Sequence, residues 1–203
     1  KLPSVEAPDD HTPTLQQMAG RFRPVWLDDR IGHTSRYIHP KENMPDYGSG
    51  ICRVSGAAVL RLMLDDPVEK KMPALINVVQ WGIDLYHMRK AGMTWPANGG
   101  HMHGRKLAIA FAGVMLENQE MIDAASRSLQ WLSEVQTNDK GQFSIIGNQG
   151  WFVRGRKRAR FDQQPIEAQS HVQACLAAAR ITRDAYWTRE ALRAFRWFQG
   201  DND

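Results

Sequence analysis

Apolar residues recur every three or four positions along most of the chain beyond residue 50. The spacing of Val54, Ala58 and Leu62 predicts a helix over residues 51–64, because these positions share one helical face. The same spacing predicts further helices over residues 69–90, 105–117, 119–136, 165–182 and 186–198. The fold class that we expect is therefore all-α.

Terminal signals support several of these boundaries. Thr14 is a suitable N-cap for a short helix over residues 14–20. Pro165, followed by the acidic Glu167, is typical of the first turn of a helix. No segment has a convincing strand pattern. The best short candidate is the segment from Phe143 to Ile146, which could be part of a small hairpin in the loop that precedes Trp151.

A short pattern that contains tryptophan recurs along the chain. Trp81, Trp131 and Trp197 each follow an apolar residue and then a polar one, at intervals that suit one α/α hairpin per repeat. Six helices then give about three hairpins, whereas a closed ring of six hairpins would need roughly twice as many. We expect a partial α/α toroid, an open bundle or a homo-oligomer that completes a ring. Chance recurrence is the alternative in a chain with seven tryptophans.

The helical region is expected to form a single α/α-hairpin domain over residues 21–203, after an N-terminal arm of residues 1–20. Residues 21–50 form a long irregular stretch that is rich in Pro, Gly, His and Tyr. Ordered loops of this length inside a domain are usually functional.

The composition is that of a folded globular protein with a modest positive charge. The 203 residues are 42% hydrophobic and 24% charged, with a formal net charge of +4 and a pI of ≈ 9.2. This charge suits a polyanionic partner such as an acidic polysaccharide or nucleic acid, and it suits simple solubility equally well. No apolar run approaches the ~18 residues of a membrane span, so we expect a soluble protein without a membrane partner. The sequence leaves open whether it is cytoplasmic or exported.

Cys52 and Cys175 both fall within apolar helical patterns, so we expect two buried free thiols. Their spacing indicates neither a disulfide framework nor a metal site.

Two groups of motifs resemble known families. Ile38-His39-Pro40, Asn43 to Gly48, Trp95 to His101 and Gly104-Arg105-Lys106 carry the first resemblance. Through them, residues 21–117 resemble an uncharacterised bacterial family that is related to alginate-lyase-like and heparinase-like α/α toroids. The resemblance implies an α/α toroid in a carbohydrate context.

The second half of the chain carries a different resemblance. Its motifs are Gly147-Asn148, Gly150-Trp151, Arg158 to Ala168, Ala194 to Phe198 and Gly200-Asp201-Asn202. Through them, residues 119–203 resemble the helical α/α-toroid domain that is attached to bacterial glycosyltransferases. This resemblance also implies a carbohydrate context, and it places a family junction near residue 118.

The glycine-rich segment before residue 105 suggests lyase chemistry. In a uronate lyase the substrate carboxylate is neutralised, which acidifies the neighbouring C–H, and a His or Tyr removes the proton. We expect Asn98 and Arg105 to neutralise the carboxylate and His101 to act as the base. Tyr47, or alternatively Tyr37, would supply the proton. The alternative is an ordinary glycine-rich turn with surface histidines.

Other polar residues near these segments are substrate-binding candidates. They are His39, Asp46, Trp95, His103 and Lys106. His101 and His103 would recruit a metal only with a third ligand, such as His39 or Asp46, and nothing in the sequence brings these together. We therefore expect neither a metal nor a cofactor.

A second polar cluster leads into the helix at residue 165. Asp162 and Glu167 could be the paired carboxylates of a glycosidase, or either could form a structural ion pair with Arg160. Gln163 and Trp151 could bind sugar, because amides bind hydroxyl groups and aromatic faces stack on pyranose rings. The basic run from Arg154 to Arg158 is interpreted as a solvated loop or as a contact for acidic glycan.

These features lead to three hypotheses. The first is a carbohydrate-active protein, polysaccharide-lyase-like or acidic-glycan-processing. The second is a non-catalytic glycan-binding or accessory module of a glycosyltransferase system. The third is a helical scaffold, natural or engineered, without activity. The expected partner is a carbohydrate such as an acidic polysaccharide, and nucleic acid is not expected because the basic run is short.

Overall fold

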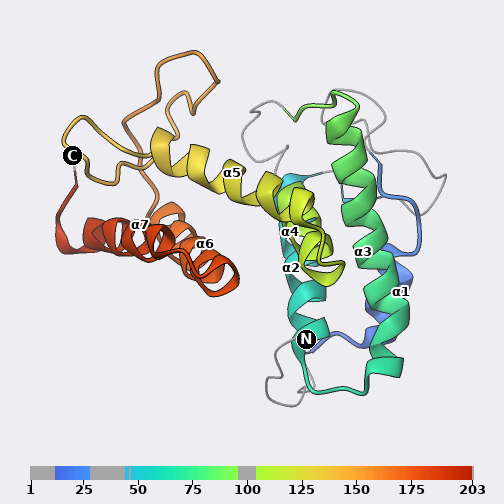
Figure 1. The fold of residues 1–203 in the computed structure, drawn as a ribbon. Helices are drawn as coiled ribbons and strands as arrows, with labels where there is room; N and C mark the ends of the chain where they lie inside the picture. Colours follow the sequence, from blue (N-terminus) through green and yellow to red (C-terminus); the bar gives the residue numbers. More distant parts are fainter. Residues whose placement is uncertain (1–11, 28–43, 46, 96–103, 203) are drawn as a thin grey trace. The chain divides into compact units, whose positions relative to one another are not determined.

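The computed structural model describes residues 12–27, 44–45, 47–95 and 104–202. These residues form α-helices and one 3-10 helix, and none of them belongs to a strand (Figure 1). The predicted all-α class is confirmed, whereas a toroid stays a prediction. The elements are α1 (Leu15–Phe22), α2 (Gly48–Met63), α3 (Val68–Lys90), α4 (Arg105–Met115), α5 (Gln119–Val135), α6 (Pro165–Thr182), α7 (Ala185–Arg196) and η1 (Trp197–Gln199).

The chain divides into two compact units, Lys1–Asp123 and Ala124–Asp203. The division falls close to the family junction that the sequence places near residue 118. That junction and the single domain over residues 21–203 stay predictions.

Unit 1 contains α1 to α4 and is built around α3, against which α1, α2 and α4 all pack. The predicted cap of α1 is confirmed, because Gln17 N donates to Thr14 Oγ1 over 3.1 Å and Thr14 N donates to Gln17 Oε1 over 2.8 Å. Phe22, Trp26 and Trp81 form the aromatic centre of its core, with ring centroids 4.5 to 5.5 Å apart.

Helices α3 and α4 approach closely at Gly82. A Cβ atom on Gly82 would lie 2.2 Å from the carbonyl oxygen of Ala108 and 2.6 Å from the Cβ atom of Ala112. The small residues therefore allow the two backbones to meet, and they fix the crossing point of the hairpin.

The end of α2 is held by the buried side chain of Arg61. Its Nε atom donates to the carbonyl oxygen of Pro13 over 2.8 Å, and its guanidinium forms an ion pair with Asp66. The hydrogen bond from Arg61 lowers the pKa of the Asp66 carboxyl group. The segment Asp65-Asp66-Pro67 thus follows the helix end, as the sequence predicts.

Unit 2 contains most of α5 together with α6, α7 and η1. Helices α6 and α7 pack side by side as a hairpin (Figure 1). Helix α6 has the predicted bounds, with Pro165 in its first turn and Arg183 as a left-handed C-cap at φ 57°. The interior includes Phe143, Ile145 and Ala194.

The best strand candidate in the sequence, residues 143–146, does not form a strand. In the described part of unit 2, Phe143 forms only an isolated antiparallel bridge with Thr137. Phe143 and Ile145 are fully buried because they insert into the core beneath α6 and α7. The alternation of apolar residues therefore reflects packing against helices.

The two cysteines differ in exposure. Cys175 is a buried free thiol, as expected, whereas Cys52 is exposed, so the expectation for Cys52 is wrong. Ile51 and Ser55 face the interior of unit 1. Cys52 directly follows Ile51, so it points away from this interior. Among the described helices, none is long and apolar enough to cross a membrane.

Candidate functional site

Part of the predicted site lies outside the described residues. This applies to the proposed base and to one of the proposed carboxylate neutralisers. It also applies to the suggested metal ligands and to the alternative proton donor. The residues concerned are Tyr37, His39, Asp46, Asn98, His101 and His103. Within the described ranges, no group of three or more His, Cys, Asp or Glu side chains could hold a metal ion.

Two of the predicted catalytic residues lie at the same end of unit 1. Tyr47 is the N-cap residue of α2, and Arg105 is the first residue of α4. The helix ends touch, since a Cβ atom on Gly104 would lie 2.6 Å from Ile51 Cγ2. The side chain of Tyr47 is 48% exposed, whereas Arg105 is only 2% exposed. Little of the Arg105 surface is therefore accessible to a carboxylate group of a polymer.

The two other predicted residues described in unit 1 are Lys106 and Trp95. Lys106 follows Arg105 on α4, and partial desolvation lowers the pKa of its ammonium group. Trp95 is half-buried and packs against the core of unit 1. Its position gives this tryptophan a structural role.

In unit 2 the predicted residues other than Glu167, which belongs to α6, lie on a folded surface loop between α5 and α6. We call residues 147–163 the basic loop. Its two arms bind each other, because Gly147 N donates to Ala159 O over 2.8 Å and Ala159 N donates to Trp151 O over 2.9 Å. The arms meet so closely that a Cβ atom on Gly147 would lie 2.0 Å from the carbonyl oxygen of Phe161. The loop therefore has a defined shape.

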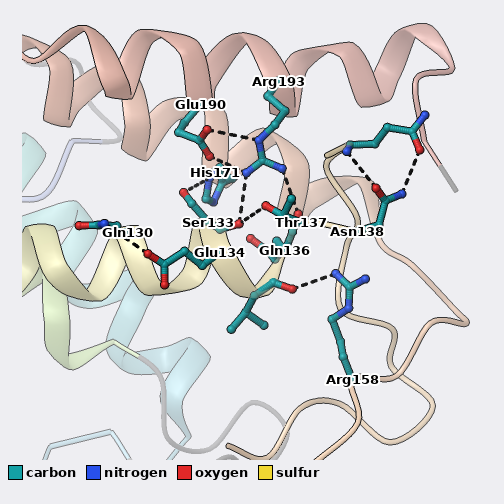
Figure 2. A network of polar contacts seen from close by, with 12 residues as sticks. Gln130, Ser133, Glu134, Gln136, Thr137, Asn138, Arg158, His171, Glu190 and Arg193 are labelled. Atoms are coloured by element: carbon teal, nitrogen blue, oxygen red, sulfur yellow. Dashed lines mark hydrogen bonds and ion pairs between the residues drawn. The ribbon is translucent and has the colours of Figure 1, made fainter. Parts of the chain in front are cut away.

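Arg158 anchors the basic loop to the end of α5. Its guanidinium donates to Val135 O over 3.0 Å (Figure 2). It also donates to Ser144 Oγ over 2.8 Å and to Ser144 O. The last carbonyl groups of a helix have no partners within the helix, and a cation there also interacts favourably with the helix dipole. The interpretation of Arg154 to Arg158 as a solvated run is thus wrong for Arg158.

A second arginine reaches the same helix end from α7. Arg193 donates to Ser133 O and to Gln136 O, over 3.2 Å each, and it forms an ion pair with Glu190. In Figure 2 the guanidinium groups of Arg193 and Arg158 approach the end of α5 from different sides. The two arginines tie α7 and the basic loop to one helix end.

A serine and a histidine lie beneath this network. Ser133 Oγ lies 2.9 Å from His171 Nε2, a spacing that nucleophilic catalysis also uses. The two residues are 1% and 3% exposed, and the ring of Phe143 lies 4.9 Å from the imidazole. Because no substrate could reach the hydroxyl group, the pair is structural.

The burial of His171 predicts a pH-dependent stability. Burial, reinforced by the charge of Arg193, lowers the pKa of His171 from 6.5 to about 4. The fold therefore favours the neutral imidazole. The neutral imidazole makes its full contribution to the free energy of unfolding above pH 6.5. As the pH falls from 6.5 toward 4, the free energy of unfolding decreases by up to about 3 kcal/mol, because the unfolded chain binds a proton at this histidine and the folded chain does not. Urea unfolding at a series of pH values measures this loss. The variant H171Q should lose this slope, and an unchanged slope would show that His171 is not its source.

The predicted carboxylate pair is divided between two environments. Glu167 accepts a hydrogen bond from Gln136 Nε2 over 3.1 Å, and burial raises the pKa of its carboxyl group. Asp162 is exposed and has a left-handed backbone at φ 61°. Glu167 thus fastens α6 to the end of α5, which is a structural contact.

Gln163 also makes structural contacts. Its Nε2 atom donates to Arg160 O over 3.2 Å, and its Oε1 atom accepts a hydrogen bond from Trp197 Nε1 over 3.3 Å. The amide therefore links the basic loop to the beginning of η1. Sugar hydroxyl groups would have to compete with these contacts.

The exposed side of the basic loop combines aromatic and cationic side chains. Trp151 is 50% exposed and Phe161 is 73% exposed. Trp151 has a left-handed backbone, at φ 51°, which is uncommon for residues other than glycine and is typical of functional loops. The exposed cationic residues of the loop are Arg154, Arg156, Lys157 and Arg160. This surface could stack on a sugar ring and pair with acid groups.

Sequence reasoning missed a second cationic surface, along α7. Arg189, Arg193 and Arg196 recur at helical spacing within the helix that the sequence predicts at residues 186–198. That recurrence is the signal that could have indicated it.

No family model, no curated protein and no solved structure matches the chain. The resemblances to toroid families therefore remain predictions.

Proposed function

We propose that the chain is a non-catalytic module that binds an acidic polysaccharide, and that the basic loop of unit 2 is its contact surface. The observation that carries this proposal is the exposed indole of Trp151 on an anchored loop that also presents Arg156 and Lys157. Aromatic faces suit pyranose rings, and the cations suit carboxylate or sulfate groups.

The shape of the loop supports binding. Its arms are hydrogen-bonded to each other, and Arg158 fixes them to α5. A surface that is ordered before binding loses little conformational entropy when the ligand arrives. Because the cations are exposed, added salt should weaken binding.

A lyase-like reaction in unit 1 is the second candidate. The observation that favours it is the position of Tyr47 and Arg105 at adjoining helix ends. This reaction would depend on His101 as the base. A rising absorbance from unsaturated uronate with alginate, heparin or pectin would support it, and H101A should then abolish the rise.

The binding proposal predicts a loss of affinity in two loop variants. We expect W151A and the double variant R156A/K157A each to bind an acidic polysaccharide about tenfold more weakly, which corresponds to about 1.4 kcal/mol. Isothermal titration of the full chain with polygalacturonate measures the change. A neutral glucan of similar length should bind weakly to every variant.

The matched control is R89A/R127A, which removes two exposed cations from α3 and α5. It lowers the net charge as much as R156A/K157A does, and it should keep most of the affinity. If the control and the loop variants bind equally well, the basic loop is not the contact surface.

A further inference from the structure

A groove lies on unit 2 between α7 and the turn of residues 138–142. Its volume is about 640 Å³, and it is open to solvent. Four cationic residues and two carboxylates are prominent in its lining: Lys140, Arg189, Arg193, Arg196, Glu190 and Asp201. The lining therefore has an excess of positive charge, which favours anionic ligands.

The cations of the groove differ in what they already bind. Arg193 is engaged with Glu190 and with the end of α5. Lys140, Arg189 and Arg196 are exposed, and none of them forms an ion pair with another residue that the structure describes. These three are the groups that a ligand can reach.

The exposed arginines are well placed for charges that repeat along a chain. Arg189 and Arg196 are seven positions apart on α7, so they lie on one face at a separation of about 10 Å along the helix axis. Leu192 lies between them and is half exposed. The surface thus alternates cationic, apolar and cationic groups.

The opposite wall of the groove is a fixed turn. Asn138 Oδ1 accepts hydrogen bonds from Lys140 N over 3.0 Å and from Gln142 N over 2.9 Å. Gln142 Nε2 in turn donates to Asp201 Oδ1 over 2.7 Å. Lys140 is therefore presented from a fixed backbone, and one carboxylate is held in the groove by the protein itself.

We propose that this groove binds a second segment of the acidic polysaccharide, with carboxylates of separated uronate units paired to Arg189 and Arg196 and a further acid group near Lys140. The identity of the polymer rests on the proposed function. The groove itself shares no residue with the basic loop.

Two surfaces on one unit make affinity depend on chain length. A uronate chain long enough to contact both surfaces gains from the high effective concentration of its second segment, whereas a short oligomer contacts only one surface. Arg158 and Arg193 both bind the end of α5, so the basic loop and α7 are connected through one helix end (Figure 2).

The test is isothermal titration of the full chain with short and long oligogalacturonates. We expect R189A/R196A to bind the long oligomer at least tenfold more weakly and to lose most of the preference for long over short chains. W151A should bind both the short and the long oligomer more weakly. D201N keeps an acceptor for Gln142 but removes a negative charge from the groove, so it should bind several-fold more tightly.

The outcomes separate the two proposals. If R189A/R196A binds the long oligomer as the unaltered chain does, the groove proposal is overturned, whatever W151A shows. If W151A retains full affinity while R189A/R196A loses it, the groove stands and the basic loop fails. Tighter binding of a single-stranded oligonucleotide than of an oligogalacturonate of equal charge would overturn the glycan assignment. The control R89A/R127A should follow the unaltered chain.

Discussion

Replacing Gly82 with alanine should destabilise unit 1 by about 3 kcal/mol. The added Cβ atom would lie 2.2 Å from Ala108 O and 2.6 Å from Ala112 Cβ, and both atoms belong to the facing helix α4. Neither the backbone of Ala108 nor the methyl group of Ala112 can rotate away. Helices α3 and α4 would have to separate, which opens the packing around Trp81. Urea unfolding, followed by helical circular dichroism, measures the loss.

The same substitution at Gly56 provides the matched control. Gly56 lies within α2, and a Cβ atom added there would have no neighbour within 4 Å beyond its own helix backbone. Alanine has the higher helix propensity, so G56A should stabilise the chain by about 0.5–1 kcal/mol. The two substitutions thus have opposite expected signs. If G82A were as stable as the unaltered chain, this result would contradict the close approach of α3 and α4 at Gly82.

Replacing Arg158 with alanine should destabilise unit 2 by about 3 kcal/mol. The substitution removes the donors to Val135 O, Ser144 O and Ser144 Oγ, and it leaves poorly solvated acceptors at the end of α5. The basic loop would also lose its anchor. We therefore expect R158A to reduce polygalacturonate affinity at temperatures where the helices remain folded.

Arg156 provides the control within the same loop. It is exposed, so R156A should change the free energy of unfolding by no more than about 0.5 kcal/mol. R158K keeps the positive charge but lacks the planar guanidinium group with its several N–H donors. It should therefore recover only part of the stability that R158A loses. Equal unfolding midpoints for R158A and R156A would mean that Arg158 does not brace the loop.

The sequence predicted the helices well because their signals are local. The first turn at Pro165 and the cap at Thr14 depend on residues within one turn of each other. The strand candidate from Phe143 to Ile146 does not form a strand, because its environment is not local. Its alternation resembles that of a strand, but no described segment forms a ladder with it, and its burial is provided by α6 and α7.

The roles of the site residues depend on distant partners that spacing does not reveal. Gln163, a candidate for sugar binding, binds Trp197. Glu167, a candidate for a glycosidase carboxylate or a structural ion pair, binds Gln136. The groove along α7 needs the turn at Lys140 as its second wall. The exposed indole of Trp151 and the cations of the run from Arg154 to Arg158 could be anticipated as binding groups from their place in a polar loop.

We propose that unit 2 binds an acidic polysaccharide without turnover. The most direct measurement is a glycan-binding screen of the unaltered chain, run beside an absorbance assay for unsaturated uronate on alginate, heparin and pectin. We expect salt-sensitive binding to acidic glycans, weak binding to neutral ones and no rise in absorbance. Absence of binding to every acidic glycan, or equal binding to neutral and acidic ones, would contradict it.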